Sequence, residues 1–146
     1  MSEEENEKKE GGIGDKEVST IMIGDVDCFT PNMTVRECIE ILLNKGISGA
    51  PLVKENTKKV VGVVGQKDLI QFAAVGGMDK ALLVFINKIK KIDELIVAAK
   101  TETIKEVIIK FLKNPVRRLL VIDDKGNLEG IITRSQLLKI FLADNT

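Results

Sequence analysis

Residues 59–70 read KVVGVVGQKDLI, and this stretch decides the fold. Residues 60–64 form a short, nearly all apolar run, which is typical of a strand that is buried on both faces. Gly65 and the polar residues after it predict a turn into a helix that starts near Lys67. The stretch therefore predicts a strand leading directly into a helix N-terminus, a junction at which proteins can bind phosphate.

A second copy of the same pattern lies at residues 128–138, which read LEGIITRSQLL. Two Thr-x-x-Glu capping boxes, which start at Thr34 and Thr103, predict a helix start at the same place in each half. The interval between the strand glycines Gly62 and Gly130 is one residue shorter than the interval between the two threonines, so the hairpins differ by one residue. A single-residue difference in a surface turn is what a structural repeat would show.

The repeat predicts a mixed α/β (α+β) fold in which each half follows the order strand, helix, strand, strand, helix. Because a unit this small buries too little surface to be stable alone, we expect the two units to share one core. The predicted boundaries are a disordered polar tail at residues 1–16, a first repeat at 17–77, a linker helix at 78–91 and a second repeat at 92–146. We expect a short strand at 26–29, another at 95–98, and a tail that can be deleted without lowering the melting temperature.

Composition argues against several classes of function. The chain has 22 basic and 22 acidic residues and five Phe, but no Trp, Tyr or His. A net charge of zero gives no general attraction to nucleic acid or to an anionic membrane, and so few aromatic side chains make base stacking improbable. Without His, the chain lacks the commonest general base and metal ligand, so we expect neither an enzyme nor a metal site.

Two features bear on the cellular compartment. The acidic, polar start of the chain is the opposite of a signal peptide, and no apolar run approaches the length of a membrane span, so a cytoplasmic location is expected. Cys28 and Cys38 do not have the spacing of metal ligands, and we expect two reduced thiols that pack as small apolar groups.

The chain resembles a tandem pair of CBS domains, known as a Bateman module. The resemblance covers about residues 18–142 and is carried by the two helix starts and by three stretches: GISGAPLV at 46–53, VRRLLVID at 116–123 and GIITRSQLL at 130–138. It implies a pseudo-two-fold disc with two clefts between the repeats. Such clefts commonly bind AMP, ADP, ATP or S-adenosylmethionine as regulatory ligands, and no cofactor is required.

The ligand motif of that family is Gly-apolar-x-Thr/Ser-x-x-Asp, in which the hydroxyl contacts phosphate and the Asp holds the ribose hydroxyls. The first copy here keeps the acid as Asp68 but has Gly65 in place of the hydroxyl. The second copy keeps the hydroxyl as Thr133 but has Gln136 in place of the acid. A charged carboxylate makes the stronger hydrogen bonds, so the first cleft is favoured for a nucleoside.

Lys67 can add positive charge at the first turn, while Arg134, Arg117 and Arg118 favour a phosphate at the second. In that family the apolar strand before the Pro position contacts the base through its backbone. The residues that the resemblance assigns to ligand binding are Thr30, Ile47, Ser48, Gly49, Ala50, Pro51, Gly65, Lys67, Asp68, Val116, Arg117, Arg118, Leu119, Thr133, Arg134 and Gln136.

A second interpretation stays open. Asp68 and Thr133 can simply stabilise helix N-termini, and the arginines can be ordinary surface charges. Both clefts would then be empty, and the chain would be a structural module that forms a homodimer through exposed helices. In either case a pair of repeats without an attached effector domain acts through self-assembly or through an effector protein that the sequence does not identify.

Overall fold

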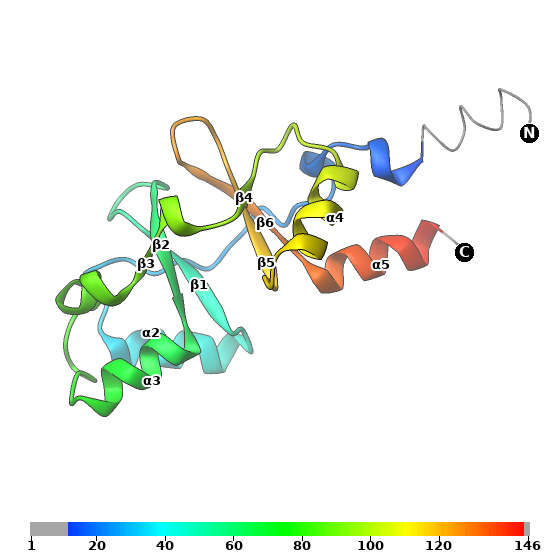
Figure 1. The fold of residues 1–146 in the computed structure, drawn as a ribbon. Coiled ribbons are helices and arrows are strands. Elements are labelled where there is room, and N and C mark those ends of the chain that lie inside the picture. The colour runs from blue at the N-terminus through cyan, green and yellow to red at the C-terminus, as the bar shows by residue number, and fades with distance from the viewer. Residues whose placement is uncertain (1–11, 145–146) are drawn as a thin grey trace, which may run out of the picture. The chain divides into compact units, whose positions relative to one another are not determined.

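The computed structural model describes residues 12–144, which form two compact units (Figure 1). The first-repeat unit comprises residues 26–95 and 125–128, and the second-repeat unit comprises residues 12–25, 96–124 and 129–144. Each contains helices and takes part in one three-stranded sheet, which confirms the predicted mixed α+β class. Within residues 12–144, no helix combines the length and apolar character needed to cross a bilayer.

In the first-repeat unit, helices α2 (Val35–Lys45) and α3 (Gln66–Ala74) pack against each other (Figure 1). The predicted capping box starts α2: the Glu37 N–H donates to Thr34 Oγ1 at 3.1 Å, and the Thr34 N–H donates to Glu37 Oε1. Gly46 ends this helix with a left-handed φ of 64°. The sheet is antiparallel, in the order β1 (Gly49–Val53), β2 (Val60–Gly65) and β3 (Lys90–Lys91).

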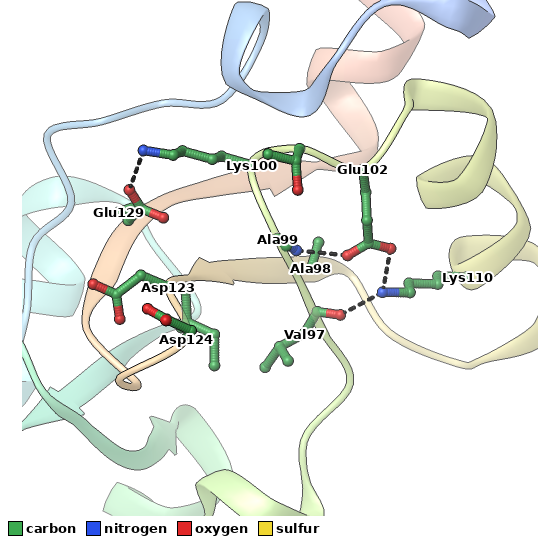
Figure 2. A pocket seen from close by; sticks show the side chains of 11 residues that line it. Val97, Ala98, Ala99, Lys100, Glu102, Lys110, Asp123, Asp124 and Glu129 are labelled. Atoms are coloured by element: carbon green, nitrogen blue, oxygen red, sulfur yellow. Dashed lines mark hydrogen bonds and ion pairs between the residues drawn. The ribbon is translucent and has the colours of Figure 1, made fainter.

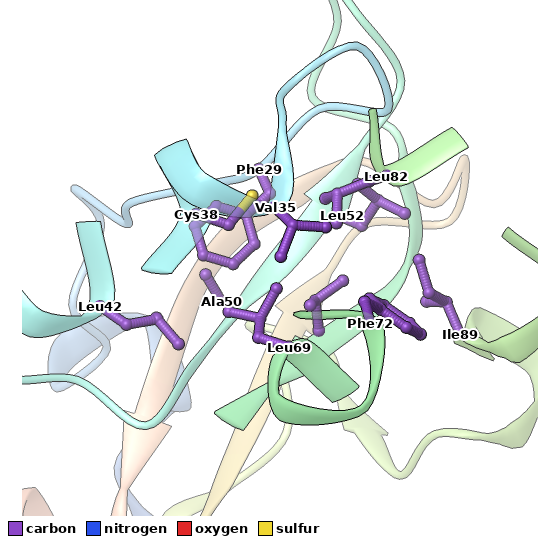
Figure 3. Close-up of a cluster of buried hydrophobic side chains, with 11 residues drawn as sticks. Phe29, Val35, Cys38, Leu42, Ala50, Leu52, Leu69, Phe72, Leu82 and Ile89 are labelled. Carbon is purple, nitrogen blue, oxygen red and sulfur yellow. The ribbon is translucent and has the colours of Figure 1, made fainter. Parts of the chain in front are cut away.

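The core of this unit is aliphatic apart from two phenylalanines and one cysteine, and Figure 3 shows most of its members. It is built from Phe29, Val35, Cys38, Leu42, Ala50, Leu52, Val64, Leu69, Phe72, Leu82 and Ile89. Cys38 is fully buried, as predicted, whereas Cys28 is only partly buried. Burial alternates along β2, so the expectation that this strand is buried on both faces is wrong: one side of it is partly exposed.

Two predicted elements of this unit take another form. Of residues 26–29, only Phe29 pairs, in parallel with Leu52. The predicted linker helix at 78–91 is instead a 3-10 helix at Leu82–Lys88, followed by β3 and a short 3-10 helix at Ile92–Glu94. The backbone of residues 80–83 is held by the loop before α2, because the Leu82 N–H donates to Met33 O and the Leu83 N–H to Pro31 O. Those donors are not available for an α-helix.

In the second-repeat unit, β4 (Val97–Ala98) pairs in parallel with β5 (Arg118–Ile122), and β6 (Leu128–Thr133) completes the sheet. Helix α4 (Ile104–Lys113) starts at the second capping threonine, Thr103, and α5 (Arg134–Asp144) follows β6 directly. The core comprises Val18, Ala98, Ile104, Val107, Leu119, Val121, Ile132 and Leu137.

The segment that leads into the first repeat, together with the first residues of that repeat, belongs to this second unit. It forms 3-10 helices at Ile13–Asp15 and Val18–Thr20, and Val18 is fully buried in the core. The Val18 N–H donates to Glu102 O at 2.8 Å, and the Ile104 N–H donates to Lys16 O at 2.9 Å. The prediction of a disordered tail is therefore wrong for residues 13–16; residues 1–11 lie outside the described part of the chain.

The segments at the starts of the two repeats are exchanged. Ile23 pairs antiparallel with Ile131 of β6, and each N–H donates to the other's carbonyl at 2.9 Å. Lys91 of β3 lies as far along the chain from Ile23 as Gly130 lies from Gly62, and it pairs antiparallel with Gly62 of β2. Each sheet is thus bordered by a segment from the start of the other repeat.

The hairpin tip of the second repeat is likewise part of the first-repeat unit. The Val60 N–H donates to Gly126 O at 3.0 Å, and the Leu128 N–H donates to Lys58 O at 2.7 Å. Neither unit is therefore a contiguous piece of the sequence.

Candidate functional site

The first half-site lies where β1 begins and β2 runs into α3. Gly49 pairs with Gly65, and the Gln66 N–H donates to Ser48 O at 3.1 Å. The Gly65 N–H donates to Asp68 Oδ2 at 2.8 Å, so the carboxylate folds back over the first turn of the helix. We use the name first half-site for residues 47–51 together with Gly65, Lys67 and Asp68.

Burial decides which parts of this half-site are open to a ligand. Gly49, Ala50 and Pro51 are buried, so only their backbone can contribute, whereas Asp68 is partly exposed and Lys67 is exposed. Gly65 has an ordinary extended backbone with φ −111°, and a Cβ built there would lie 3.7 Å from Ser48 O. The fold therefore does not require glycine here, and the missing hydroxyl is not a steric necessity.

Thr30 does not join the first half-site. It follows Phe29, which pairs with Leu52 near the far end of β1, and its hydroxyl is hydrogen-bonded to Asn32. The Asn32 amide in turn donates to Glu55 at 3.0 Å, in the turn after β1. Thr30 thus lies at the opposite end of β1 from Ser48 and Gly65.

The second half-site lies at the N-terminus of α5 and comprises Val116–Leu119, Thr133, Arg134 and Gln136. Thr133 caps the helix, because its Oγ1 accepts from the Gln136 N–H at 3.1 Å. Arg134 ties the helix start to the segment before β5: its N–H donates to Arg117 O at 3.3 Å and its Nε to Val116 O at 2.9 Å. Six of these seven residues are at least partly exposed; Leu119 is fully buried and can offer only its backbone.

Two side chains of the second half-site, those of Arg118 and Gln136, have polar groups in unfavourable surroundings. Burial lowers the pKa of the Arg118 guanidinium below its ordinary value, and the positive charge of Arg117 lowers it further. The side-chain oxygen of Gln136, Oε1, is buried and accepts no hydrogen bond from the described residues. A buried acceptor without a donor is costly, so a rotation of this side chain that presents its oxygen to a hydrogen-bond donor on a ligand would be favoured.

The ligand motif has a second, structural role in this chain. Thr-x-x-Asp is also the pattern of a capping box, in which the hydroxyl and the acid each satisfy a backbone N–H at a helix start. In the first copy, the acid Asp68 accepts from the Gly65 N–H, and the hydroxyl is missing. In the second copy, the Thr133 hydroxyl accepts from the Gln136 N–H, and the acid is missing. Each retained side chain stabilises its helix, so any ligand has to bind groups that already serve the fold.

A comparison with known proteins decides the family. The CBS domain model matches residues 18–75 and again residues 89–143. The chain belongs to the CBS-domain family. Both matched regions are CBS domains, which confirms the resemblance seen in the sequence.

Relatives of this CBS pair include two proteins of Methanocaldococcus jannaschii. The chain is 36% identical over 132 residues to the uncharacterized protein MJ1232, covering 90% of this chain and 39% of that protein. It is 32% identical over 129 residues to inosine-5'-monophosphate dehydrogenase, covering 85% of this chain and 23% of the enzyme. The CBS pair thus spans less than half the length of these curated relatives.

Solved structures with the same fold include three complexes with ligands. The CBS domain pair of protein MJ0100 with 5'-methylthioadenosine and S-adenosyl-L-methionine has a TM-score of 0.69 at 24% identity, covering 88% of this chain and 97% of that one. CbpB with c-di-AMP has a TM-score of 0.76 at 20% identity and covers 96% and 93%. CBSX2 with AMP has a TM-score of 0.68 at 24% identity and covers 89% and 98%. At these identities the likeness shows the fold.

The CBS pair also has a cavity that sequence reasoning missed. It is open to solvent, has a volume of about 700 Å³ and lies in the second-repeat unit, beside β4, the loop after it, α4 and the end of β5 (Figure 2). Its lysines are paired: Lys110 with Glu102 at 2.6 Å and Lys100 with Glu129 at 3.2 Å. In residues 12–144 no group of three or more acidic or sulfur side chains is arranged to hold a metal ion.

One residue in the wall of this cavity has a counterpart in the first repeat. Ala99, in its wall, occupies the same place before the second capping threonine, Thr103, that Thr30 occupies before the first, Thr34. The cavity contacts Ile122 at the end of β5, whereas the second half-site contacts Arg118 at its beginning. At about 3.3 Å per residue, the two regions lie at opposite ends of the strand, roughly 13 Å apart.

Proposed function

We propose that this CBS pair is a regulatory module that binds an adenosine nucleotide or adenosyl compound: AMP, ADP, ATP or S-adenosylmethionine. The observation that carries the proposal is the buried Gln136 Oε1, which has no donor among the described residues and lies beside a helix N-terminus. A ribose hydroxyl is a donor of the required kind. The binding of 5'-methylthioadenosine, c-di-AMP and AMP by proteins of the same fold supports this choice of ligand class.

The residues take distinct roles in this proposal. In the first half-site, Asp68 accepts hydrogen bonds from ribose, the backbone of residues 47–51 lies against the base, and Lys67 supplies positive charge. In the second half-site, Thr133 and the arginines bind phosphate, and Gln136 accepts from ribose as a neutral partner. Thr30 has no part in the first half-site, because it lies at the other end of β1.

The output is regulatory rather than catalytic. A ligand that binds one conformation better than another shifts the population toward it, and an effector protein or a second copy of the chain detects the change. The curated relatives are at least twice as long as this chain, so a further domain is one place where such an effector can reside.

The test is thermal unfolding followed by circular dichroism, since the chain has no Trp or Tyr. A ligand at 100 times its dissociation constant adds about 2.7 kcal/mol, a shift of roughly 5–10 °C at this size. We expect such a shift with at least one of the four compounds at millimolar concentration. No shift with any of them would contradict the proposal.

A variant then tests the assignment of Asp68. Asp68→Asn keeps an oxygen for the Gly65 N–H, and with it the helix cap, but removes the charge that strengthens a bond to ribose. We expect nucleoside affinity to fall about tenfold, while Asp93→Asn, an exposed control in the same unit, leaves it unchanged. Equal affinities for both variants would remove Asp68 from the site.

One observation favours a second candidate function, a structural homodimer. A groove of about 550 Å³ runs between α2 and α3 and is lined almost entirely by apolar side chains. Leu43 and Ile70 are 73% and 67% exposed there. We expect a dimer in sedimentation equilibrium and a monomer when both residues are changed to Asp; a monomeric parent protein would rule this candidate out.

A further inference from the structure

The segment between the two repeats presents two large apolar side chains to solvent. Leu83 and Val84, in the 3-10 helix at residues 82–88, are 59% and 61% exposed. A 3-10 helix turns once in every three residues, so Leu82 and Phe85 share one face. Leu82 is fully buried and Phe85 is partly buried, which places that face against the core of the first-repeat unit. Leu83 and Val84 therefore point away from the core.

The backbone that carries these two side chains is fixed at both ends. At the start of the helix, the N–H groups of Leu82 and Leu83 donate to carbonyl oxygens in the loop at residues 31–33. Just after its end, the Lys91 ammonium donates to the Ile89 carbonyl at 2.8 Å. A partner that binds here does not have to order the segment first, so the entropic cost of binding is reduced.

Exposed lysines flank this apolar pair. Lys80 precedes the helix, Lys88 ends it and Lys90 follows it, and all three are exposed. Residues 80–92 contain no carboxylate, and within residues 12–144 none of these three lysines forms an ion pair. The whole chain has a net charge of zero, but salt screens charges beyond about 10 Å, so a partner at this surface meets the local positive charge.

We use the name linker surface for Lys80, Leu83, Val84, Lys88 and Lys90. An apolar centre with positive charge on both sides is complementary to a segment that has apolar side chains in the middle and carboxylates at its ends. The seven-residue 3-10 helix is about 14 Å long. An extended segment of about four or five residues has the same length, so a short stretch of a partner protein is sufficient.

The carboxylates next to the linker surface favour a peptide over a lipid membrane. Asp79 directly precedes Lys80, Asp93 and Glu94 follow soon after Lys90, and all three acids are exposed. A flat anionic bilayer that met the lysines would also meet these negative charges, whereas a narrow peptide can lie along the lysines alone.

We propose that the linker surface is the docking site for an effector protein, which contributes an acidic segment with two apolar side chains at its centre. The inference rests on the proposed function, in which an effector detects the ligand state of the CBS pair, and it identifies the surface that the effector contacts. Leu83 and Val84 lie between the two regions that match the CBS domain model, residues 18–75 and 89–143. The docking site is therefore a feature of this chain's linker, and it shares no residue with either half-site.

The test is a heteronuclear NMR titration of the isotope-labelled chain with a synthetic peptide, acetyl-EELLEE-amide. We expect the backbone amide signals of residues 80–90 to shift, with a dissociation constant below about 1 mM. Changing both Leu83 and Val84 to Ser, or both Lys80 and Lys88 to Glu, should weaken binding at least about tenfold. The peptides acetyl-EESSEE-amide and acetyl-QQLLQQ-amide, which lack the apolar centre and the charges respectively, should show a similar loss.

Two variants elsewhere in the chain are matched controls. Leu112→Ser changes a leucine of α4 that is 82% exposed, and Lys139→Glu reverses an exposed charge on α5. Neither should change peptide affinity by more than about twofold. No binding at millimolar peptide, shifts confined to residues outside 80–90, or an equal loss of affinity in a control would contradict the proposal. Circular dichroism of each variant without peptide shows that a loss of binding is not a loss of fold.

Other occupants of the linker surface would give different results, and each would overturn the proposal. Sedimentation of the chain with phosphatidylserine vesicles but no peptide binding would identify a membrane. A dimer in sedimentation equilibrium that the serine variant converts to monomers would identify a second copy of the chain. Signals of residues 80–90 that shift when residues 2–11 are deleted would identify the acidic start of this chain.

Thermal unfolding with AMP, ADP, ATP and S-adenosylmethionine separates this inference from the proposed function. If one of these compounds stabilises the chain but the peptide does not bind, the docking site is wrong and the proposed function stands. If the peptide binds at residues 80–90 but no compound stabilises the chain, the proposed function is wrong and the docking site stands. If neither effect is seen, both are wrong.

Discussion

At the scale of single residues, the chain keeps one capping side chain at each of two helix starts, Asp68 at α3 and Thr133 at α5. A complete ligand motif would have both the acid and the hydroxyl at the same helix start. The sequence alone predicted that Asp68 and Thr133 stand at helix starts, because capping patterns are local. It could not predict that Gln136 Oε1 is buried without a partner, since burial depends on chain segments far away in the sequence. Nor could it place Thr30, whose position depends on the pairing of Phe29 with Leu52.

Changing Gln136 should separate stability from binding. Gln136→Met removes the unsatisfied oxygen and keeps an unbranched side chain of similar size, so we expect the free protein to gain about 1 kcal/mol. The same change removes an acceptor for ligand and should weaken binding. Urea unfolding with and without ligand measures both effects. Gln66→Met, at an exposed position of α3, is the control and should stay within about 0.5 kcal/mol; a loss of stability at Gln136 would mean that its amide stabilises the fold.

The two thiols should differ in reactivity. Burial, with a smaller contribution from the Glu37 charge, raises the pKa of Cys38 to about 12. A raised thiol pKa favours the unreactive protonated form, so at pH 8 only about one molecule in ten thousand carries the thiolate. We expect a disulfide reagent at pH 8 to modify Cys28, which is partly exposed, and to reach Cys38 only after unfolding. Rapid modification of both thiols in the folded protein would contradict this.

At the scale of elements, hydrophobic period and capping boxes predicted the four α-helices of the repeats and their main strands, and the structure agrees. The predictions that failed concern elements whose form is set by hydrogen bonds to distant parts of the chain. The apolar residues at 81–89 have helical spacing, but the backbone at residues 80–83 is hydrogen-bonded to residues 31–35, so no α-helix starts at residue 78, and the element there is a 3-10 helix at Leu82–Lys88. Phe85 stacks on Phe72 at 4.4 Å, a contact that the sequence could not show.

Close packing of the backbone explains why glycine occurs at the same place in both repeats, at Gly62 and Gly130. A Cβ at Gly62 would overlap the backbone carbonyl of Lys90, and one at Gly130 would lie 2.7 Å from Ile23 O. Only glycine therefore leaves room for the segment that borders each sheet, which contains Lys90 beside Gly62 and Ile23 beside Gly130. The sequence showed the repeat of these glycines but not its reason, because the bordering segments come from other parts of the chain.

Alanine in place of Gly62 or Gly130 should displace the chain segment that borders the sheet. We expect Gly130→Ala and Gly62→Ala each to destabilise the fold by about 2–3 kcal/mol, as overpacking against backbone does. Gly24→Ala is the matched control, since a Cβ there meets nothing within 4 Å. Thermal unfolding measures all three. A midpoint for Gly130→Ala equal to that of the control would show that the segment at 22–23 can move aside at no cost.

At the scale of the whole molecule, the sequence predicted two repeats, and the family match confirms them. It did not predict which residues complete each unit. Val18 lies at the start of the first repeat in sequence, yet it is fully buried in the core of the second-repeat unit. The type of an apolar residue favours burial, but it does not indicate in which of two similar cores the residue is buried.

Val18→Ala tests this assignment. Removing two methyl groups from a fully buried position should cost roughly 2 kcal/mol. Because the lost contacts belong to the second core, amide hydrogen exchange should accelerate in residues 104–133 more than in residues 35–53. Val35→Ala, equally buried in the other core, should give the reverse pattern. Faster exchange confined to residues 35–53 in Val18→Ala would contradict the assignment.

The segments that each unit takes from the other part of the sequence determine when the unit can complete its fold during synthesis. The first-repeat unit includes residues 125–128, whose backbone is bonded to Lys58 and Val60, so it stays incomplete until the chain has been synthesised to Leu128 of 146 residues. The second-repeat unit needs α5, which ends later still. Neither unit can finish folding before residues 125–144 have been synthesised, so the two units complete their folds within the same short interval of synthesis.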